Sequence, residues 1–130
     1  MCKKQRKFCR RIKTDEDRKH PLPTSFGGLV TCDHIFVGTG DQDDGTDDTT
    51  ALVILDRFTG WVECHPAPQK TKTETKLALQ RFAGPRGSLE LLYSDGSLEV
   101  GSAAEELGWL HDTCTPDRKQ TNGVAERAVR

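Results

Sequence analysis

Long apolar runs are absent from this 130-residue sequence. The longest uninterrupted stretch of aliphatic side chains is Ala51–Leu55, far shorter than the roughly 20 residues that a membrane-spanning helix needs. The basic N-terminal segment is not followed by an apolar stretch of the kind found in a signal peptide. We therefore expect a soluble, intracellular protein with no membrane partner.

Cysteine and histidine lack the spacing of a metal-binding module. The five cysteines include no Cys-x-x-Cys pair, and the four histidines do not follow the spacing of zinc ligands. The odd number of cysteines, with Cys32 and Cys114 in strand-like segments, favours reduced and partly buried thiols over a disulfide framework. We predict no zinc site.

Aromatic residues are scarce at 6%, and hydrophobic residues make up only 34% of the chain against 30% charged residues. A chain of this length and composition has a thin core and corresponds to one small domain, or most of one. Residues 1–25 end in Pro21-Leu22-Pro23 and are interpreted as a basic, poorly ordered linker. Residues 26–130 then form the folded domain.

The net charge of −1 hides a segregation of charge along the chain. Residues 1–20 hold nine Lys or Arg against three acids, and the segment from residue 117 has a net charge of +2. Residues 41–48 hold five Asp and no base. Basic ends around an acidic middle favour a polyanionic partner, although a solvated basic arm explains the N-terminal run equally well. The acidic segment fails the EF-hand pattern, because Gly40 and Gln42 would stand at ligand positions, and it is interpreted as a solvated insert.

Three acidic residues, Asp33, Asp95 and Glu126, are hard to explain structurally as a set. Asp33 interrupts the apolar run of residues 29–37, where alternation places it on one strand face between Leu29 and Ile35. A carboxylate desolvated there is costly unless it is paired or binds a metal. Asp95 follows the apolar run 89–94, and Glu126 lies just inside an expected helix start.

The pattern of apolar residues, turns and helix caps predicts a βββαβαβα order. The helical crossover before the fourth strand indicates a parallel pairing with the first strand, which would bring Asp33 and Asp95 together on adjacent strands. The last helix would then deliver Glu126 to the same edge. We expect strands over 28–37, 50–56, 61–67, 89–94 and 109–114, and helices over 72–82, over 103–107 and from about 123.

Three segments carry a family resemblance: Thr31-Cys32-Asp33-His34, Tyr93-Ser94-Asp95-Gly96-Ser97 and Gln120-Thr121-Asn122-Gly123-x-x-Glu126-Arg127. In this order, the chain from about residue 26 resembles the integrase catalytic core of retroviruses and LTR retrotransposons. The resemblance implies a ribonuclease-H-like α/β fold with a five-stranded mixed sheet flanked by helices. It implies that Asp33, Asp95 and Glu126 are catalytic and bind two Mg²⁺ or Mn²⁺ ions, a role that suits hard oxygen ligands.

The same resemblance implies DNA integration as the function, with nicking near a DNA 3′ end followed by strand transfer. The DNA partners would be the element ends and the target, the location would be the nucleus, and the source would be a Pol polyprotein. Gln120 and Asn122 match positions that contact the DNA end. Lys119, Arg127 and Arg130 are candidates for phosphate contacts, although a solvated basic face is at least as good an explanation for these three.

Each acid also has an ordinary explanation. Asp95 alone fits a turn after a strand, and Glu126 alone fits a first-turn acid near a helix N-terminus. The match of all three residues to one pattern favours the metal site.

Two departures from the family pattern are visible. Only 30 residues separate Asp95 from Glu126, and we place the shortening in the helix before Gly108. The chain ends soon after Glu126, so we expect a C-terminally truncated core in which the family's homodimer interface is lost. The alternatives left open are an inactive nucleic-acid-binding relic of a retroelement and a ribonuclease-H-like nuclease.

Overall fold

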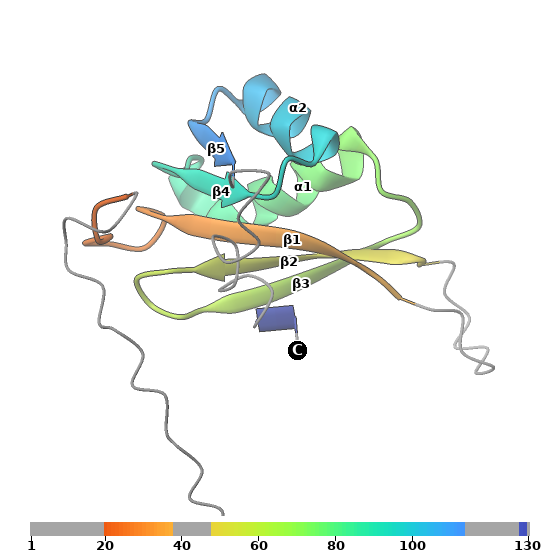
Figure 1. The fold of residues 1–130 in the computed structure, drawn as a ribbon, viewed down its shortest axis with the longest axis horizontal. Helices are drawn as coiled ribbons and strands as arrows, with labels where there is room; N and C mark the ends of the chain where they lie inside the picture. Colours follow the sequence, from red (N-terminus) through yellow and green to blue (C-terminus); the bar gives the residue numbers. More distant parts are fainter. Residues whose placement is uncertain (1–19, 38–47, 114–127, 130) are drawn as a thin grey trace, which may run out of the picture.

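The computed structural model describes residues 20–37, 48–113 and 128–129, and the following statements concern those residues. They form a single five-stranded sheet with the strand order β3-β2-β1-β4-β5 and two α-helices (Figure 1). In chain order, the elements are β1 (Val30–Phe36), β2 (Thr50–Asp56), β3 (Val62–Ala67), α1 (Lys72–Ala83), a 3₁₀ turn (Gly84–Arg86), β4 (Leu92–Ser94), α2 (Leu98–Leu107) and β5 (His111–Thr113).

The sheet combines two kinds of pairing. β1, β2 and β3 form an antiparallel meander, whereas β4 pairs in parallel with both β1 and β5. The parallel pairs require crossover connections, which α1 and the 3₁₀ turn supply before β4 and α2 supplies before β5. This confirms the predicted α/β fold with a mixed sheet. The predicted final helix lies almost entirely outside the described residues.

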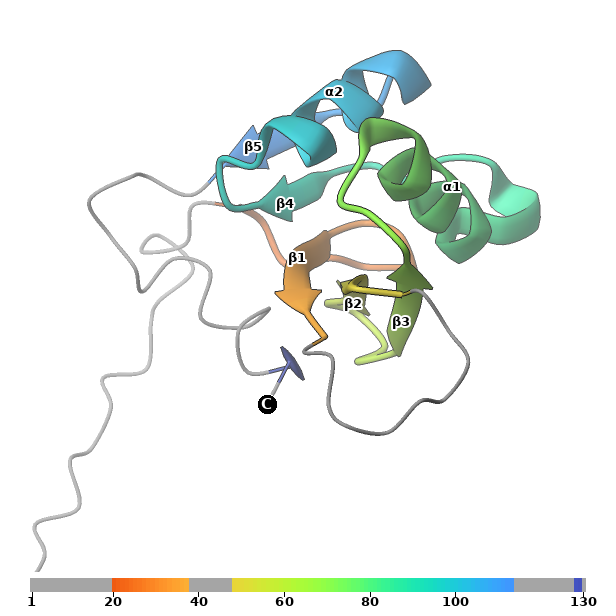
Figure 2. The ribbon, with the colours of Figure 1, turned by 90° about the vertical axis from the view of Figure 1, so that its right-hand side faces the viewer.

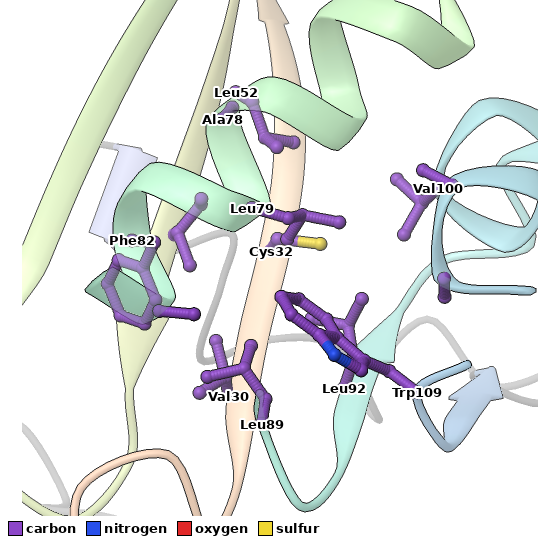
Figure 3. Close-up of a cluster of buried hydrophobic side chains, with 14 residues drawn as sticks. Val30, Cys32, Leu52, Ala78, Leu79, Phe82, Leu89, Leu92, Val100 and Trp109 are labelled. Carbon is purple, nitrogen blue, oxygen red and sulfur yellow. The ribbon is translucent and has the colours of Figure 1, made fainter. Parts of the chain in front are cut away.

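Both helices lie on the same face of the sheet (Figures 1 and 2). The core between them and the sheet is a single cluster to which β1 contributes Val30 and Cys32 (Figure 3). Leu79 from α1 and Val100 from α2 are fully buried in the same cluster. The other members are Leu52, Ile54, Ala78, Phe82, Ala83, Leu89, Leu92, Ala103, Ala104 and Trp109.

The termini of the helices follow from local sequence. Thr71 caps α1 by accepting a hydrogen bond from the Glu74 backbone N–H at 3.3 Å. Gly108 ends α2 with a φ of 70°, a left-handed conformation that glycine adopts without strain. No helix among the described residues is long and apolar enough to cross a membrane.

The structure corrects several predicted boundaries. α2 starts at Leu98 rather than at residue 103, because Val100 is fully buried and compensates for the poor helix propensity of Gly101. The helix is therefore a regular element of 10 residues, which starts earlier than the predicted 103–107. β4 and β5 are shorter than the predicted strands 89–94 and 109–114, since regular pairing covers only three residues in each. The bounds of β2 match the prediction.

Candidate catalytic edge of the sheet

Asp33 lies midway along β1, opposite Val53 of β2. It is half-buried, and alternation places it on the face away from the helices, since Val30 and Cys32 form the core side of the strand. The expectation that Asp33 would be desolvated between Leu29 and Ile35 was therefore too strong.

Asp95 directly follows β4, and the parallel register brings it beside Asp33. The last aligned pair of β1 and β4 is Cys32 with Ser94, so Asp33 and Asp95 are the next residues on two adjacent strands. Neighbouring strands lie about 4.8 Å apart. The structure thus brings together two of the three predicted carboxylates where β4 ends.

The charges of both carboxylates affect the pKa of the neighbouring Cys32 thiol. Burial raises the pKa of the Cys32 thiol well above its usual range, and the negative charges of Asp95 and Asp33 raise it further. The thiol stays protonated and points into the core toward the helices (Figure 3). A buried thiol of this kind is a poor metal ligand.

The backbone around Asp95 is held by Ser94 and His111. The Ser94 hydroxyl donates to the Asp95 carbonyl at 2.7 Å and lies 2.8 Å from His111 Nε2. Because the single hydroxyl proton goes to the carbonyl, His111 Nε2 must donate to Ser94 Oγ. Burial lowers the pKa of His111, against the opposing charges of Asp112 and Asp95, which favours the neutral ring that this arrangement uses.

A second set of contacts leads from Asp95 to the starts of both helices. The backbone N–H of Ser97 donates to Asp95 Oδ1 at 3.3 Å, and the Ser97 hydroxyl donates to Glu99 Oε2 at 2.8 Å. Glu99 Oε2 lies 3.5 Å from Lys70 Nζ, on the loop before α1. These contacts join Asp95, on the sheet, to α2 and to the β3–α1 loop.

His34 lies in the middle of this polar group. Burial lowers its pKa, Lys70 lowers it further, and Glu99 and Asp95 act in the opposite direction. Thr75 donates its hydroxyl proton to the Thr71 carbonyl at 2.8 Å, so the 3.3 Å contact between its Oγ1 and His34 Nε2 uses a proton from the histidine. His34 therefore links β1 to α1.

The third predicted carboxylate, Glu126, lies outside the described residues, as do the candidate DNA contacts Lys119, Gln120, Asn122, Arg127 and Arg130. Most of the acidic segment 41–48 is also outside them. Within the part of the chain that the structure describes, no group of three or more His, Cys, Asp or Glu side chains is placed to hold a metal ion.

The sequence interpretation gave no role to Ser97, which lies in a quoted motif, or to Glu99, Lys70 and His111 around this edge. Ser97 had a usable signal, because a serine before Leu98 and Val100 is typical of a helix N-cap position. The contacts of the other three residues depend on how the helices and β5 pack, which their own sequence neighbourhoods do not encode.

The solved structures that are similar to this chain include the following two. A chain of the simian T-cell lymphotropic virus intasome, solved in complex with PP2A regulatory subunit B56 gamma, matches with a TM-score of 0.64 and 20% identity. The catalytic core domain of BIV integrase matches with a TM-score of 0.55 and 23% identity. The present chain has the fold of a retroviral integrase catalytic core.

The integrase-core match covers most of this chain but only part of the similar ones. It extends over 86% of the present chain and 39% of the intasome chain, and over 80% of the present chain and 65% of the BIV core. No protein-family model and no curated protein sequence matches the chain. At these identities the likeness establishes the ribonuclease-H-like integrase-core fold, while activity has to be argued from the site itself.

Proposed function

We propose that this chain belongs to the integrase family and is built for metal-dependent polynucleotidyl transfer, with DNA 3′-end nicking and strand transfer as the reactions. The observation that carries the proposal is the β1–β4 register, which makes Asp33 and Asp95 neighbours where β4 ends, within an integrase-core fold. A turn acid after an arbitrary strand would have no reason to meet a second carboxylate from the central strand.

The donor set fits hard divalent cations. Asp33 and Asp95 offer carboxylate oxygens, and the adjacent Cys32 thiol keeps its proton, so oxygen is the donor that this edge presents. Mg²⁺ and Mn²⁺ prefer such ligands. In our proposal, Glu126 completes the set from the last helix. Bound there, two ions would activate the attacking water or 3′-hydroxyl and stabilise the leaving oxygen.

The remaining residues have positioning and binding roles in this proposal. Ser94 and His111 hold the Asp95 carbonyl, and the Ser97 N–H holds its carboxylate, so the side chain is preset for ligation. Gln120 and Asn122 would contact the DNA end. Lys119, Arg127 and Arg130 would bind phosphates without regard to sequence.

We further propose that residues 26–130 are the core domain, with residues 1–25 as a basic linker. The partners would be the ends of an element and its target DNA. Homodimerisation, nuclear localisation and an origin in a Pol polyprotein belong to the same proposal.

The test is a gel assay of the full chain with short duplex DNA and Mn²⁺. Joined products support the integrase proposal, cleavage alone supports a nuclease of the same fold, and retardation alone supports a binding relic. Asp33→Asn and Asp95→Asn should remove the products while leaving retardation intact. Glu63→Gln is the matched control, because Glu63 is a half-buried acid on β3 that pairs with His65 away from this edge.

A further inference from the structure

Lys70 is the last residue in the series of contacts that starts at Asp95 and passes through Ser97 and Glu99, and its ion pair is long. Lys70 Nζ lies 3.5 Å from Glu99 Oε2, and both side chains are about one-third exposed. Two residues further along the chain, Lys72 Nζ lies 2.9 Å from a carboxylate in the last turn of α2, that of Glu106. The pair nearer to Asp95 is therefore the more weakly formed of the two.

Glu99 does not depend on Lys70 for its position. Its own backbone N–H, then the Ser97 hydroxyl, and to a smaller extent Lys70 lower the pKa of the Glu99 carboxyl, so it stays ionised at neutral pH. The hydrogen bond from Ser97 at 2.8 Å holds it at the start of α2. The ion pair between Lys70 and Glu99 can break without leaving the carboxylate unsatisfied, because Glu99 keeps its hydrogen-bond partners at the start of its own helix and its access to water.

Nucleic acid that approaches Asp33 and Asp95 meets like charge. A phosphodiester is negative and so are the two carboxylates, so binding at this edge needs a nearby cation that can turn to a phosphate. Lys70 has the right position, since it contacts Glu99, which accepts from the Ser97 hydroxyl, and the Ser97 backbone N–H contacts Asp95 Oδ1. A lysine ammonium on a flexible stem suits a sequence-independent phosphate contact.

We propose that Lys70 binds a backbone phosphate of DNA lying across the Asp33–Asp95 edge, and that Glu99 takes the place of that phosphate when no DNA is bound. The inference rests on the proposed DNA-binding function and adds a residue to it from outside the predicted motifs. It makes Glu99 an internal competitor of the substrate. Neutralising the two members of one ion pair should therefore change DNA affinity in opposite directions.

The test is fluorescence anisotropy of a labelled short duplex with the full chain in EDTA, over a range of salt concentrations. Lys70→Ala should weaken binding about threefold and reduce the slope of log affinity against log salt by about 1. Glu99→Gln should strengthen binding by about two- to fivefold, the range expected when an exposed ion pair stops competing. Lys72→Ala and Glu106→Gln, from the ion pair at the last turn of α2, the opposite end of that helix from Asp95, should leave affinity and slope unchanged.

Equal weakening by Lys70→Ala and Lys72→Ala would overturn the inference, because it would show a general loss of positive charge. Unchanged or weaker binding by Glu99→Gln would overturn the competitor role, and undetectable binding by the unaltered chain would overturn both. EDTA keeps this test separate from the proposed chemistry. A chain that never cuts DNA with Mn²⁺ can still show opposite changes in DNA affinity for Lys70→Ala and Glu99→Gln. An active chain can fail to show them.

Discussion

Two kinds of acidic site occur on this sheet, and they differ in what satisfies the carboxylate. Asp56, at the end of β2, is fully buried and accepts from the Gly27 N–H at 2.9 Å and from the Thr59 N–H and hydroxyl at 2.7 and 2.6 Å. Asp33 and Asp95 are half-buried and stand next to each other on adjacent strands. One carboxylate closes a turn, whereas the other two belong to neighbouring residues on adjacent strands where β4 ends.

The contrast shows that burial of an acid does not identify a functional site. Asp33 was selected in the sequence as an acid in an apolar strand, but Asp56 fits that description better and is explained by local hydrogen bonds. What distinguishes Asp33 is the second carboxylate brought beside it by a parallel pairing. The following experiments aim at this distinction between a structural carboxylate and a paired, functional one.

The largest effect is expected from Asp95→Asn on chemistry. Loss of one of the proposed metal ligands should lower the rate of Mn²⁺-dependent DNA cleavage about a hundredfold or more, since metal ligation contributes several kcal/mol to such reactions. The free energy of unfolding should change by less than about 1 kcal/mol, because an amide oxygen at this position can still accept from the Ser97 backbone N–H. Comparable losses of rate and of stability, measured by gel assay and urea unfolding, would assign Asp95 to structure.

Asp56→Ala should affect the stability of the fold, whereas Asp95→Asn should affect the rate of DNA cleavage. It leaves the buried N–H groups of Gly27 and Thr59 without an acceptor, which should reduce the free energy of unfolding by about 3 kcal/mol or more. Asp56→Asn should lose less, because it keeps one acceptor oxygen. Urea unfolding checks both values, and a change of less than about 1 kcal/mol for Asp56→Ala would remove the contrast between the two sites.

Thiol labelling offers a smaller and more local test. Because burial and then the two carboxylates raise the pKa of Cys32, alkylation of the native chain at mildly alkaline pH should modify exposed Cys64 and spare Cys32. Peptide mass mapping gives the extent at each cysteine. Unfolding in urea should make Cys32 reactive, whereas rapid native labelling of Cys32 would contradict the packing around the two carboxylates.

The smallest effect is expected far from the edge, at Glu106. Lys76 and then Lys72 lower the pKa of this exposed carboxyl to about 2 from its usual 4.5. A lowered pKa in the folded chain contributes stability above the unfolded value, and this is lost as pH falls from 4.5 toward 2. Glu106→Gln should therefore change the urea midpoint slightly at neutral pH and not at all near pH 2, with Glu105→Gln as the control.

The predictable parts of the fold are those with a local signal. β2 is a continuous apolar run bounded by Thr50 and by the turn after Asp56, and the prediction gave its bounds. α2 was predicted too short, since Gly101 and β-branched Val100 weaken the helix pattern, while burial of Val100 stabilises the helix in the folded chain. Tertiary packing decided this boundary.

In the candidate site, too, some features could be predicted from the sequence and others depend on tertiary packing. The adjacency of Asp33 and Asp95 followed from a parallel pairing that the helical crossover already implied. The side of β1 that faces the core did not follow, because both alternating sets contain apolar residues, and only the packing of Leu79 against Cys32 selects one. The Lys70–Glu99 ion pair could not be predicted from the sequence either, since it depends on how α2 lies beside the β3–α1 loop.

The most direct test of the central claim is an anomalous difference map from crystals of the full chain soaked in Mn²⁺. We expect a peak at the end of β4 within about 2.0–2.3 Å of carboxylate oxygens from both Asp33 and Asp95, and no such peak in Asp95→Asn crystals. A well-ordered map with both carboxylates visible and no manganese between them, or with manganese only elsewhere, would contradict it.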